Sequence, residues 1–395
     1  MSCEPRAPRA AAVVPLSEPV IGGNEWAYVK ECLDTGWVSS AGAFVTRLEQ
    51  WAVEHLACTA AVAVTSGTAA LHVALLLAGV RPGDAVVVPS LTFIAPANAV
   101  SYVGARPLFV DAEADHLQLD PAALRVFFAR DCRRGGGSVR HRDTGRPVSA
   151  VIAVHVLGHP SDLDAVRAVA DDVGLPVIED ATESLGSLYR GRPVGALAGL
   201  GCLSFNGNKI ATAGGGGRVL CQDEATAARA RYLTTQAKDD PLEYVHREVG
   251  FNYRLTNLQA ALGLAQVEQL ETFVAARRAV HARYEQGLAA VAGVEPIAEA
   301  PWAFANQWLS AVRVDPVAFG HDSRWLLARL RQAGVETRPL WQPLHRSPAF
   351  GGASTERDWV ADELNRQVLC LPSSASLSVA DQTRVIALIA GSASA

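Results

Sequence analysis

Lysine is scarce in this chain. Of its 35 lysine and arginine residues, only three are lysine, namely Lys30, Lys209 and Lys238. Arginine stays protonated in proteins, whereas lysine can lose its proton and become a nucleophile. Because the chain uses arginine for nearly every positive charge, a retained lysine is a candidate for chemistry that arginine cannot perform. The composition therefore narrows the search for a nucleophilic amine to three residues.

Features of several other protein classes are also missing. The net charge is −5 and no basic stripe is present, which argues against nucleic acid as a partner. The most apolar region, 60–80, is broken by polar residues, so we expect no membrane helix and no membrane partner. The seven cysteines form no CxxC pair, and the apolar stretch at 10–14 is too short for a signal peptide. We therefore expect reduced thiols and a cytoplasmic location.

The hydrophobic pattern predicts an α/β fold. Between residues 60 and 222, short β-branched runs alternate with Ala- and Leu-rich segments. This alternation is typical of a mostly parallel central sheet flanked by helices. From about 255 the pattern changes to long amphipathic helices. We expect a large α/β domain over 15–262 and a small C-terminal α+β domain over 263–395, with a basic, glycine-rich surface loop or hairpin insertion at 130–147.

Polar residues follow several of the predicted strands, where sheets of this kind bind their ligands. The turn Ser66-Gly67-Thr68 stands between a strand and a helix. Backbone N–H groups and hydroxyls at such a turn can bind an anion, although a simple capped helix fits equally well. Asp180 and Asp111 both end a strand. The pattern alone does not choose between these two acids.

Two further segments at strand ends carry candidate residues. Ser204 begins a segment that reaches Lys209, and the glycines that follow leave room for a cofactor ring. A surface lysine is the alternative interpretation. Phe93 could stack on a flat ring or pack in the core. His155 and His159 are spaced like a zinc pair but do not share a helix face, so we predict no metal site.

Together these residue types fit one chemistry. An enzyme that uses pyridoxal 5′-phosphate (PLP) needs a lysine for the Schiff base, an acid near the pyridine nitrogen and an anion site for the phosphate. The sequence offers each of them after a predicted strand of one α/β domain. We therefore infer that PLP is the cofactor.

Seven stretches of the chain resemble the DegT/DnrJ/StrS family of sugar aminotransferases, within the fold-type I PLP enzymes. The resemblance covers about residues 15–375, through GGNEWAYVKECLDTGWVSSAG, VTSGTAALHVAL, PSLTFIAPANAV, VIEDATESLGS, SFNGNKIATAGGGG, VGFNYRLTNLQAALGLAQ and TRPLWQPLHRSPAF. Within the family, these motifs are most similar to those of the branch that aminates 4-keto-6-deoxy nucleotide sugars for legionaminic-type nonulosonic acids. The resemblance implies an aminotransferase of nonulosonic acid or surface polysaccharide biosynthesis, which takes its amino group from an amino acid such as L-glutamate.

The resemblance also implies individual roles. Lys209 matches the Schiff-base lysine, and Asp180 matches the acid that pairs with the pyridinium nitrogen, which decides against Asp111. Glu183 stands near the cofactor oxygen, where many members carry His or Gln. The other positions that match cofactor-binding residues are Ser66, Gly67, Thr68 and Ser204 at the phosphate, Phe93 on the ring, and Asn252, which reaches the phosphate of the partner subunit. A homodimer with active sites at the interface is therefore expected.

Three alternatives stay open on the sequence. Transamination of a carbocyclic ketone would use the same residues. A PLP-dependent sugar dehydratase would carry His in place of Lys209, so the lysine argues against it. A non-enzymatic PLP-binding regulator is disfavoured because no helix-turn-helix segment is present. Arg338 and His345 lie in a stretch expected to line the substrate entrance, where a substrate contact and a structural role fit equally well.

Overall fold

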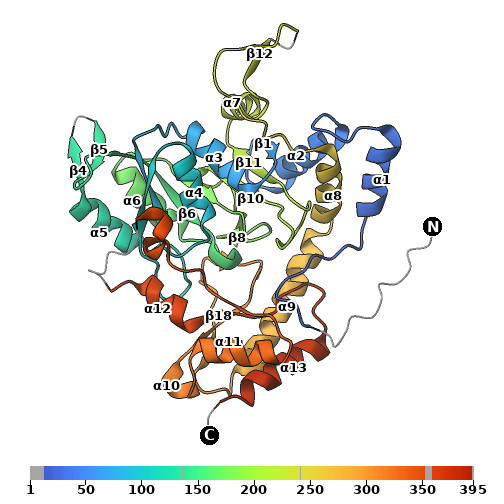
Figure 1. The fold of residues 1–395 in the computed structure, drawn as a ribbon, viewed down its shortest axis with the longest axis vertical. Coiled ribbons are helices and arrows are strands. Elements are labelled where there is room, and N and C mark those ends of the chain that lie inside the picture. Colours follow the sequence, from blue (N-terminus) through green and yellow to red (C-terminus); the bar gives the residue numbers. More distant parts are fainter. Residues whose placement is uncertain (1–12, 136, 241, 352–357, 394–395) are drawn as a thin grey trace.

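The computed structural model describes residues 13–135, 137–240, 242–351 and 358–393. Its main feature is a nine-stranded sheet in the order β1-β11-β10-β7-β6-β2-β3, to which β5 and β4 are added beside β6 (Figure 1). The seven strands of this order are β1 (Ala60–Val64), β11 (Gly217–Cys221), β10 (Gly199–Ser204), β7 (Val177–Asp180), β6 (Pro147–Val154), β2 (Ala85–Pro89) and β3 (Arg106–Val110).

The sheet is mostly parallel. The strands from β10 to β3 pair in parallel, whereas β11 is antiparallel to both of its neighbours. All residues of β1, β2, β7 and β11 are buried, as expected for strands covered on both faces. The α/β fold with a mostly parallel sheet, predicted from the sequence, is confirmed.

Helices cover both faces of this sheet. One hydrophobic core lies between the sheet and α3 (Gly67–Leu77), α4 (Ala95–Tyr102) and α7 (Glu224–Thr234). A second core lies on the opposite face, under α2 (Ala43–His55), α5 (Pro121–Asp131), α6 (Leu163–Asp172) and α8 (Asn257–Val267). Helix α1 (Glu25–Thr35) packs against α8.

Two hairpins extend from this body. The predicted hairpin at 130–147 is confirmed as β4 (Cys132–Gly135) and β5 (Ser138–His141), and β5 pairs with the start of β6. The hairpin of β12 (Lys238–Asp240) and β13 (Val245–His246) projects beyond α7 at the top of Figure 1.

The C-terminal part is a smaller α+β assembly. The long helix α9 (Leu270–Leu288) leads into it (Figure 1). A four-stranded sheet follows in the order β14-β16-β18-β17. The strands are β14 (Val294–Pro296), β16 (Ala311–Val314), β18 (Val368–Cys370) and β17 (Arg338–Pro339). The helices are α10 (Pro316–Phe319), α11 (Ser323–Gln332), α12 (Val360–Gln367) and α13 (Val379–Ala390). Helices α9, α11 and α13 enclose a third hydrophobic core.

The predicted domain boundary at 262/263 falls inside α8, and the division at that point stays a prediction.

A small sheet joins the two parts of the chain. β15 (Ala303–Phe304) pairs with β8 (Leu188–Tyr189), which pairs with β9 (Arg192–Pro193). The pairing brings the segment after β15 beside the loop that follows β7.

In the part of the chain that the structure describes, no helix is long and apolar enough to cross a membrane.

Candidate active site

A cavity of about 340 Å³ lies where β7 and β10 end, beside the N-terminus of α3. Seven of the nine site residues predicted from the sequence line it, namely Ser66, Gly67, Thr68, Phe93, Glu183, Ser204 and Lys209. The residues come from four separate segments, and the parallel strands bring these segments to one edge of the sheet.

The N-terminus of α3 forms one wall of the cavity. Ser66 is the N-cap residue, and its Oγ accepts a hydrogen bond from the N–H of Ala69 at 3.0 Å. A Cβ atom added to Gly67 would lie 2.9 Å from Cβ of Ser204 and 3.1 Å from Cγ2 of Thr182, so only glycine fits there. The first N–H groups of a helix and two nearby hydroxyls suit a phosphate group.

Lys209 lies in the loop after β10 and also lines the cavity. Its side chain is 13% exposed, and Nζ lies 3.5 Å from Oε1 of Glu183. The amine also lies over the indole ring of Trp308, 4.1 Å from the ring centroid. The amine is thus in a largely buried position with two partners.

Glu183 is held from its other side. Its Oε2 accepts a hydrogen bond from the N–H of Leu157 at 2.9 Å. Leu157 lies in the 3-10 turn η1 (Val156–Gly158) and has a positive φ of 58°. Burial raises the pKa of the Glu183 carboxyl, while the positive charge of Lys209 and the Leu157 N–H lower it.

Asp180 ends β7 and is 2% exposed. Its Oδ1 accepts a hydrogen bond from the N–H of Thr182 at 3.1 Å. Burial raises the pKa of the Asp180 carboxyl, and the opposing influences are the Thr182 hydrogen bonds and the charge of Lys209. Asp180 is not among the residues that line the cavity, but its carboxylate is close enough to interact electrostatically with Lys209.

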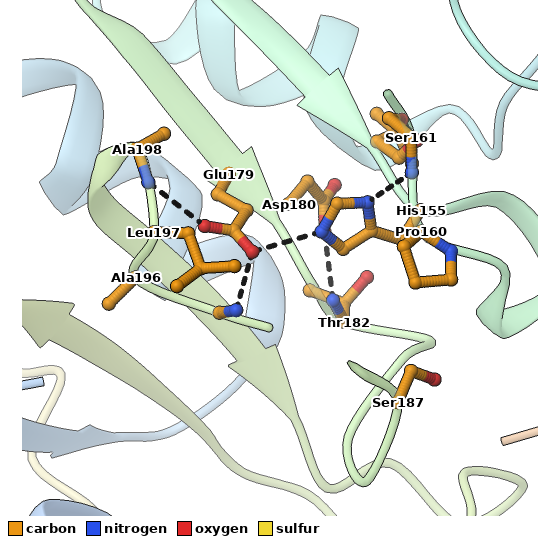
Figure 2. A network of polar contacts seen from close by, with 12 residues as sticks. His155, Pro160, Ser161, Glu179, Asp180, Thr182, Ser187, Ala196, Leu197 and Ala198 are labelled. Atoms are coloured by element: carbon orange, nitrogen blue, oxygen red, sulfur yellow. Dashed lines mark hydrogen bonds and ion pairs between the residues drawn. The ribbon is translucent and has the colours of Figure 1, made fainter. Parts of the chain in front are cut away.

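A fully buried hydrogen-bond network lies beside Asp180 (Figure 2). The N–H of Ser161 donates to Nδ1 of His155 at 3.0 Å, so the ring proton is on Nε2, which donates to Oε1 of Glu179 at 3.0 Å. Glu179 also accepts hydrogen bonds from the N–H groups of Gly195 and Ala198. The network fixes the end of β7. Both ring nitrogens of His155 take part in it, so His155 has a structural role.

Other sequence candidates also have structural roles. Asp111 accepts hydrogen bonds from the N–H groups of Val360 and Ala361 at 2.8 and 3.0 Å, and so caps α12. His159 accepts from the N–H of Ala300 at 2.9 Å and donates from Nδ1 to its neighbour's carbonyl. His345 is buried and bonds to the Ser90 hydroxyl at 2.6 Å, so a structural role fits it.

The residues around the cavity suit PLP. The wall at Gly67 would receive its phosphate, Lys209 would bind its aldehyde, and Phe93 would contact its ring. A carboxylate at Asp180 would stabilise a proton on the ring nitrogen. The tight packing of Ser204 and Thr182 against Gly67 places the Ser204 hydroxyl beside the start of α3, where the phosphate would lie.

Several residues that line the cavity were not predicted as site residues from the sequence, among them Thr182, Trp308 and Trp341. Thr182 and Trp341 lie within recognised motifs, so those motifs contained a signal. No motif pointed to Trp308, because it lies in a segment that is distant in the sequence from the other site residues. Its Nε1 donates to the carbonyl of Asn208, 100 positions away, at 2.7 Å.

A second cavity of about 520 Å³ adjoins the first and shares Asn208, Trp308 and Trp341 with it. Among the described residues that line the two cavities, Arg338 is the one arginine. The guanidinium donates one hydrogen bond to the carbonyl of Thr337, and the side chain is exposed. A large anionic substrate could therefore extend from Lys209 towards Arg338.

Asn252 lies outside the cavity of its own chain. It is exposed, and it pairs with Thr235 at the base of the β12–β13 hairpin. Its predicted contact with a phosphate in a partner subunit stays a prediction.

Comparisons with known proteins agree over nearly the whole chain. The model of the DegT/DnrJ/EryC1/StrS aminotransferase family matches residues 19–390. The chain is 37% identical over 380 residues to GDP-perosamine synthase of Caulobacter vibrioides (strain ATCC 19089 / CIP 103742 / CB 15), over 95% of this chain and 97% of that protein. It is also 37% identical over 378 residues to EpsN of Bacillus subtilis (strain 168), assigned by inference as a pyridoxal phosphate-dependent aminotransferase, over 95% of this chain and 94% of that one.

Solved structures give the same result. The crystal structure of S. venezuelae DesV is 32% identical, with a TM-score of 0.83 over 93% of this chain and 94% of that chain. The structure of DesI in the presence of its TDP-sugar product is 27% identical, with a TM-score of 0.85 over 98% of this chain and 93% of that chain.

Proposed function

The chain belongs to the DegT/DnrJ/EryC1/StrS aminotransferase family, a family that depends on PLP, and we propose that it transfers an amino group from L-glutamate to a 4-keto-6-deoxy nucleotide sugar. One observation carries this proposal: the cavity at Lys209 continues into a second cavity that contains Arg338. A keto group near Lys209 and a diphosphate near Arg338 would occupy both. The similarity to GDP-perosamine synthase and to DesI, whose structure was solved in the presence of its TDP-sugar product, supports the choice of substrate class.

The chain's own residues provide the proton transfers. When bound, PLP supplies an electrophilic carbon and a ring that withdraws electrons from the reacting bond. The neutral Nζ of Lys209 then accepts the proton that leaves Cα of the amino donor, and later returns a proton to C4 of the sugar. Asp180 holds a proton on the ring nitrogen, and Phe93 and Trp308 exclude water from the cavity.

The substrate class is tested with a panel of ketones. We expect the purified, glutamate-treated protein to recover its yellow absorbance band when it receives one 4-keto-6-deoxy sugar linked to UDP, GDP or dTDP. Carbocyclic ketones are the control. Recovery with a carbocyclic ketone and with no keto-sugar would contradict the proposed substrate. The sugar that reacts fastest also decides whether the predicted legionaminic-type branch is correct.

Arg338→Ala should affect only the sugar half of the reaction. We expect the KM for the nucleotide sugar to rise about tenfold or more, since a charge-assisted hydrogen bond to phosphate contributes roughly 1.5–3 kcal/mol. The rate at which glutamate bleaches the band should stay the same. Equal effects on both half-reactions would show that Arg338 does not contact the nucleotide part of the substrate.

A homodimer with shared active sites is also part of the proposal. Large apolar side chains are exposed on and near the β12–β13 hairpin, with Leu242 86%, Tyr244 67% and Val249 82% exposed. Trp26 on α1 is 80% exposed. Contiguous exposed apolar surface marks interaction sites, and Leu242 and Tyr244 lie close together between β12 and β13. The β12–β13 hairpin and the nearby Asn252 could therefore reach the cavity of a second copy.

Mixed dimers test this arrangement. Lys209→Ala should be inactive, and Asn252→Ala should be weak at limiting PLP because a phosphate contact is lost. If Asn252 acts across the interface, each dimer with one subunit of each kind has one intact site. Coexpression should then restore about a quarter of wild-type activity, by random pairing in a two-fold dimer. Activity no higher than that of the two parents would place Asn252 outside the partner's site.

The cytoplasmic location stays a prediction.

A further inference from the structure

The free amine of Lys209 has two partners of different kinds. Glu183 offers a carboxylate oxygen at 3.5 Å, and Trp308 offers the face of its indole ring at 4.1 Å. Both partners are buried, with Trp308 3% and Glu183 6% exposed. A carboxylate and an aromatic face both attract an ammonium group, and both attract it more strongly when water is excluded.

Each partner is fixed in place by backbone bonds. Trp308 donates from Nε1 to the carbonyl of Asn208, the residue directly before Lys209, at 2.7 Å. Glu183 accepts from Leu157 through its second oxygen. The side-chain amide of Asn306 donates to the carbonyls of Glu183 and Leu185 at 2.9 Å each, so the segment that carries Trp308 is fastened to the loop that carries Glu183.

We propose that Glu183 and Trp308 form a binding site for the ε-ammonium group of Lys209 whenever the lysine is not bonded to the cofactor, which makes Trp308 a positioning residue for the catalytic lysine. The site keeps the released amine at one place between proton transfers. The proposal rests on the proposed function for the role of Lys209, but the contacts themselves do not. The other titratable groups that interact with this trio are Asp180 and the buried thiol of Cys370.

The scarcity of lysine makes a direct test possible. Full-length protein freed of PLP is exposed to a trace of acetic anhydride, which reacts with neutral amines, and the labelling of each lysine is measured by peptide mass spectrometry. Lys30, which pairs with Asp34 on the surface, and Lys238 are internal controls. The readout is the Lys209 labelling rate of each variant relative to the wild type, at pH 8 and near pH 11.

We expect Glu183→Gln to raise Lys209 labelling at pH 8 by about three- to tenfold, since the loss of one partner leaves more of the amine neutral. Near pH 11, close to the ordinary pKa of a lysine amine, the difference should shrink to about threefold or less. Trp308→Leu should behave in the same way, whereas Trp308→Phe keeps an aromatic face and should stay within about twofold of the wild type.

Two results would overturn the proposal. One is unchanged labelling in Glu183→Gln at pH 8. The other is an increase that is as large near pH 11 as at pH 8, because it would come from a more open cavity rather than from a lost ammonium site. Unchanged rates at Lys30 and Lys238 and an unchanged near-ultraviolet circular dichroism spectrum show that a variant is folded. If Trp308→Leu does not fold, Glu183→Gln alone decides. No readout depends on PLP or on turnover, so a failure here is distinguishable from a failure of the proposed function.

Discussion

Replacing Lys209 by alanine or by arginine should abolish turnover. The amine must both bond to the cofactor and carry a proton, and a guanidinium group stays charged and does neither. We expect a loss of at least about 10⁴-fold in kcat, the upper range for proton transfer by a positioned side chain, with the lost covalent step in addition. The arginine variant separates reactivity from charge, because it keeps the positive charge beside Glu183.

The measurement is kcat with glutamate and the best keto-sugar of the panel, on protein saturated with PLP. Lys30→Ala is the matched control, and it should keep full activity because Lys30 is exposed on α1 and lies outside the cavity. Reduction with borohydride should fix the cofactor to the wild type and to neither Lys209 variant. Turnover above a few per cent in Lys209→Ala would remove this residue from the centre of the mechanism.

Asp180→Asn should reduce kcat by about 10²–10³-fold, the loss seen when a preorganised electrostatic contact is removed from a reacting centre. A neutral amide cannot hold the proton on the ring nitrogen, and each pKa unit of such stabilisation contributes about 1.4 kcal/mol. The side chain stays the same size, and the backbone bond from Thr182 can still be accepted. Binding of PLP should therefore weaken much less than kcat falls.

The chain offers a matched control in Asp111. It also ends a strand, but it caps α12 through Val360 and Ala361. Asp111→Asn should leave kcat nearly unchanged and lower the stability of the protein by about 1 kcal/mol or less. Steady-state turnover with glutamate and the best keto-sugar gives the first quantity, and thermal unfolding gives the second. Equal losses of kcat in the two variants would contradict the assignment of Asp180.

The comparison of these two acids shows what the sequence can predict. Residues that follow parallel strands were expected to meet at one sheet edge, and seven of the predicted residues do line one cavity. The pattern could not separate Asp111 from Asp180, because the difference depends on what packs against each. Asp111 faces the start of a helix 249 positions away, and no local pattern contains that information.

The sequence could not place Trp308 or Asn252 for two different reasons, because each depends on a contact with a distant part of the structure. Trp308 reaches the cavity only because the chain returns from the C-terminal part and β15 pairs with β8, a pairing of short segments with little periodicity. Asn252 was recognised only through a family motif, and its predicted partner lies in a second copy of the chain. Contacts between distant segments, and contacts between subunits, are the part of the site that local sequence patterns do not contain.

Glu183 shows a further limit. Its position was identified from the sequence, together with its departure from the His or Gln common in the family. Its bond to the N–H of Leu157 depends on a left-handed residue in the turn η1, which is unusual for leucine and was not predicted. The pairing with Lys209 then follows from burial of both side chains.

The central claim, that this chain is a PLP-dependent aminotransferase acting through Lys209, is tested most directly by one half-reaction. The purified yellow protein is mixed with L-glutamate in the absence of any acceptor, and absorbance and 2-oxoglutarate are followed together. We predict that the yellow band fades while one equivalent of 2-oxoglutarate forms per subunit, and that Lys209→Ala does neither at a measurable rate. A band that persists with glutamate and with every other amino donor, with no keto acid released, would contradict the mechanism.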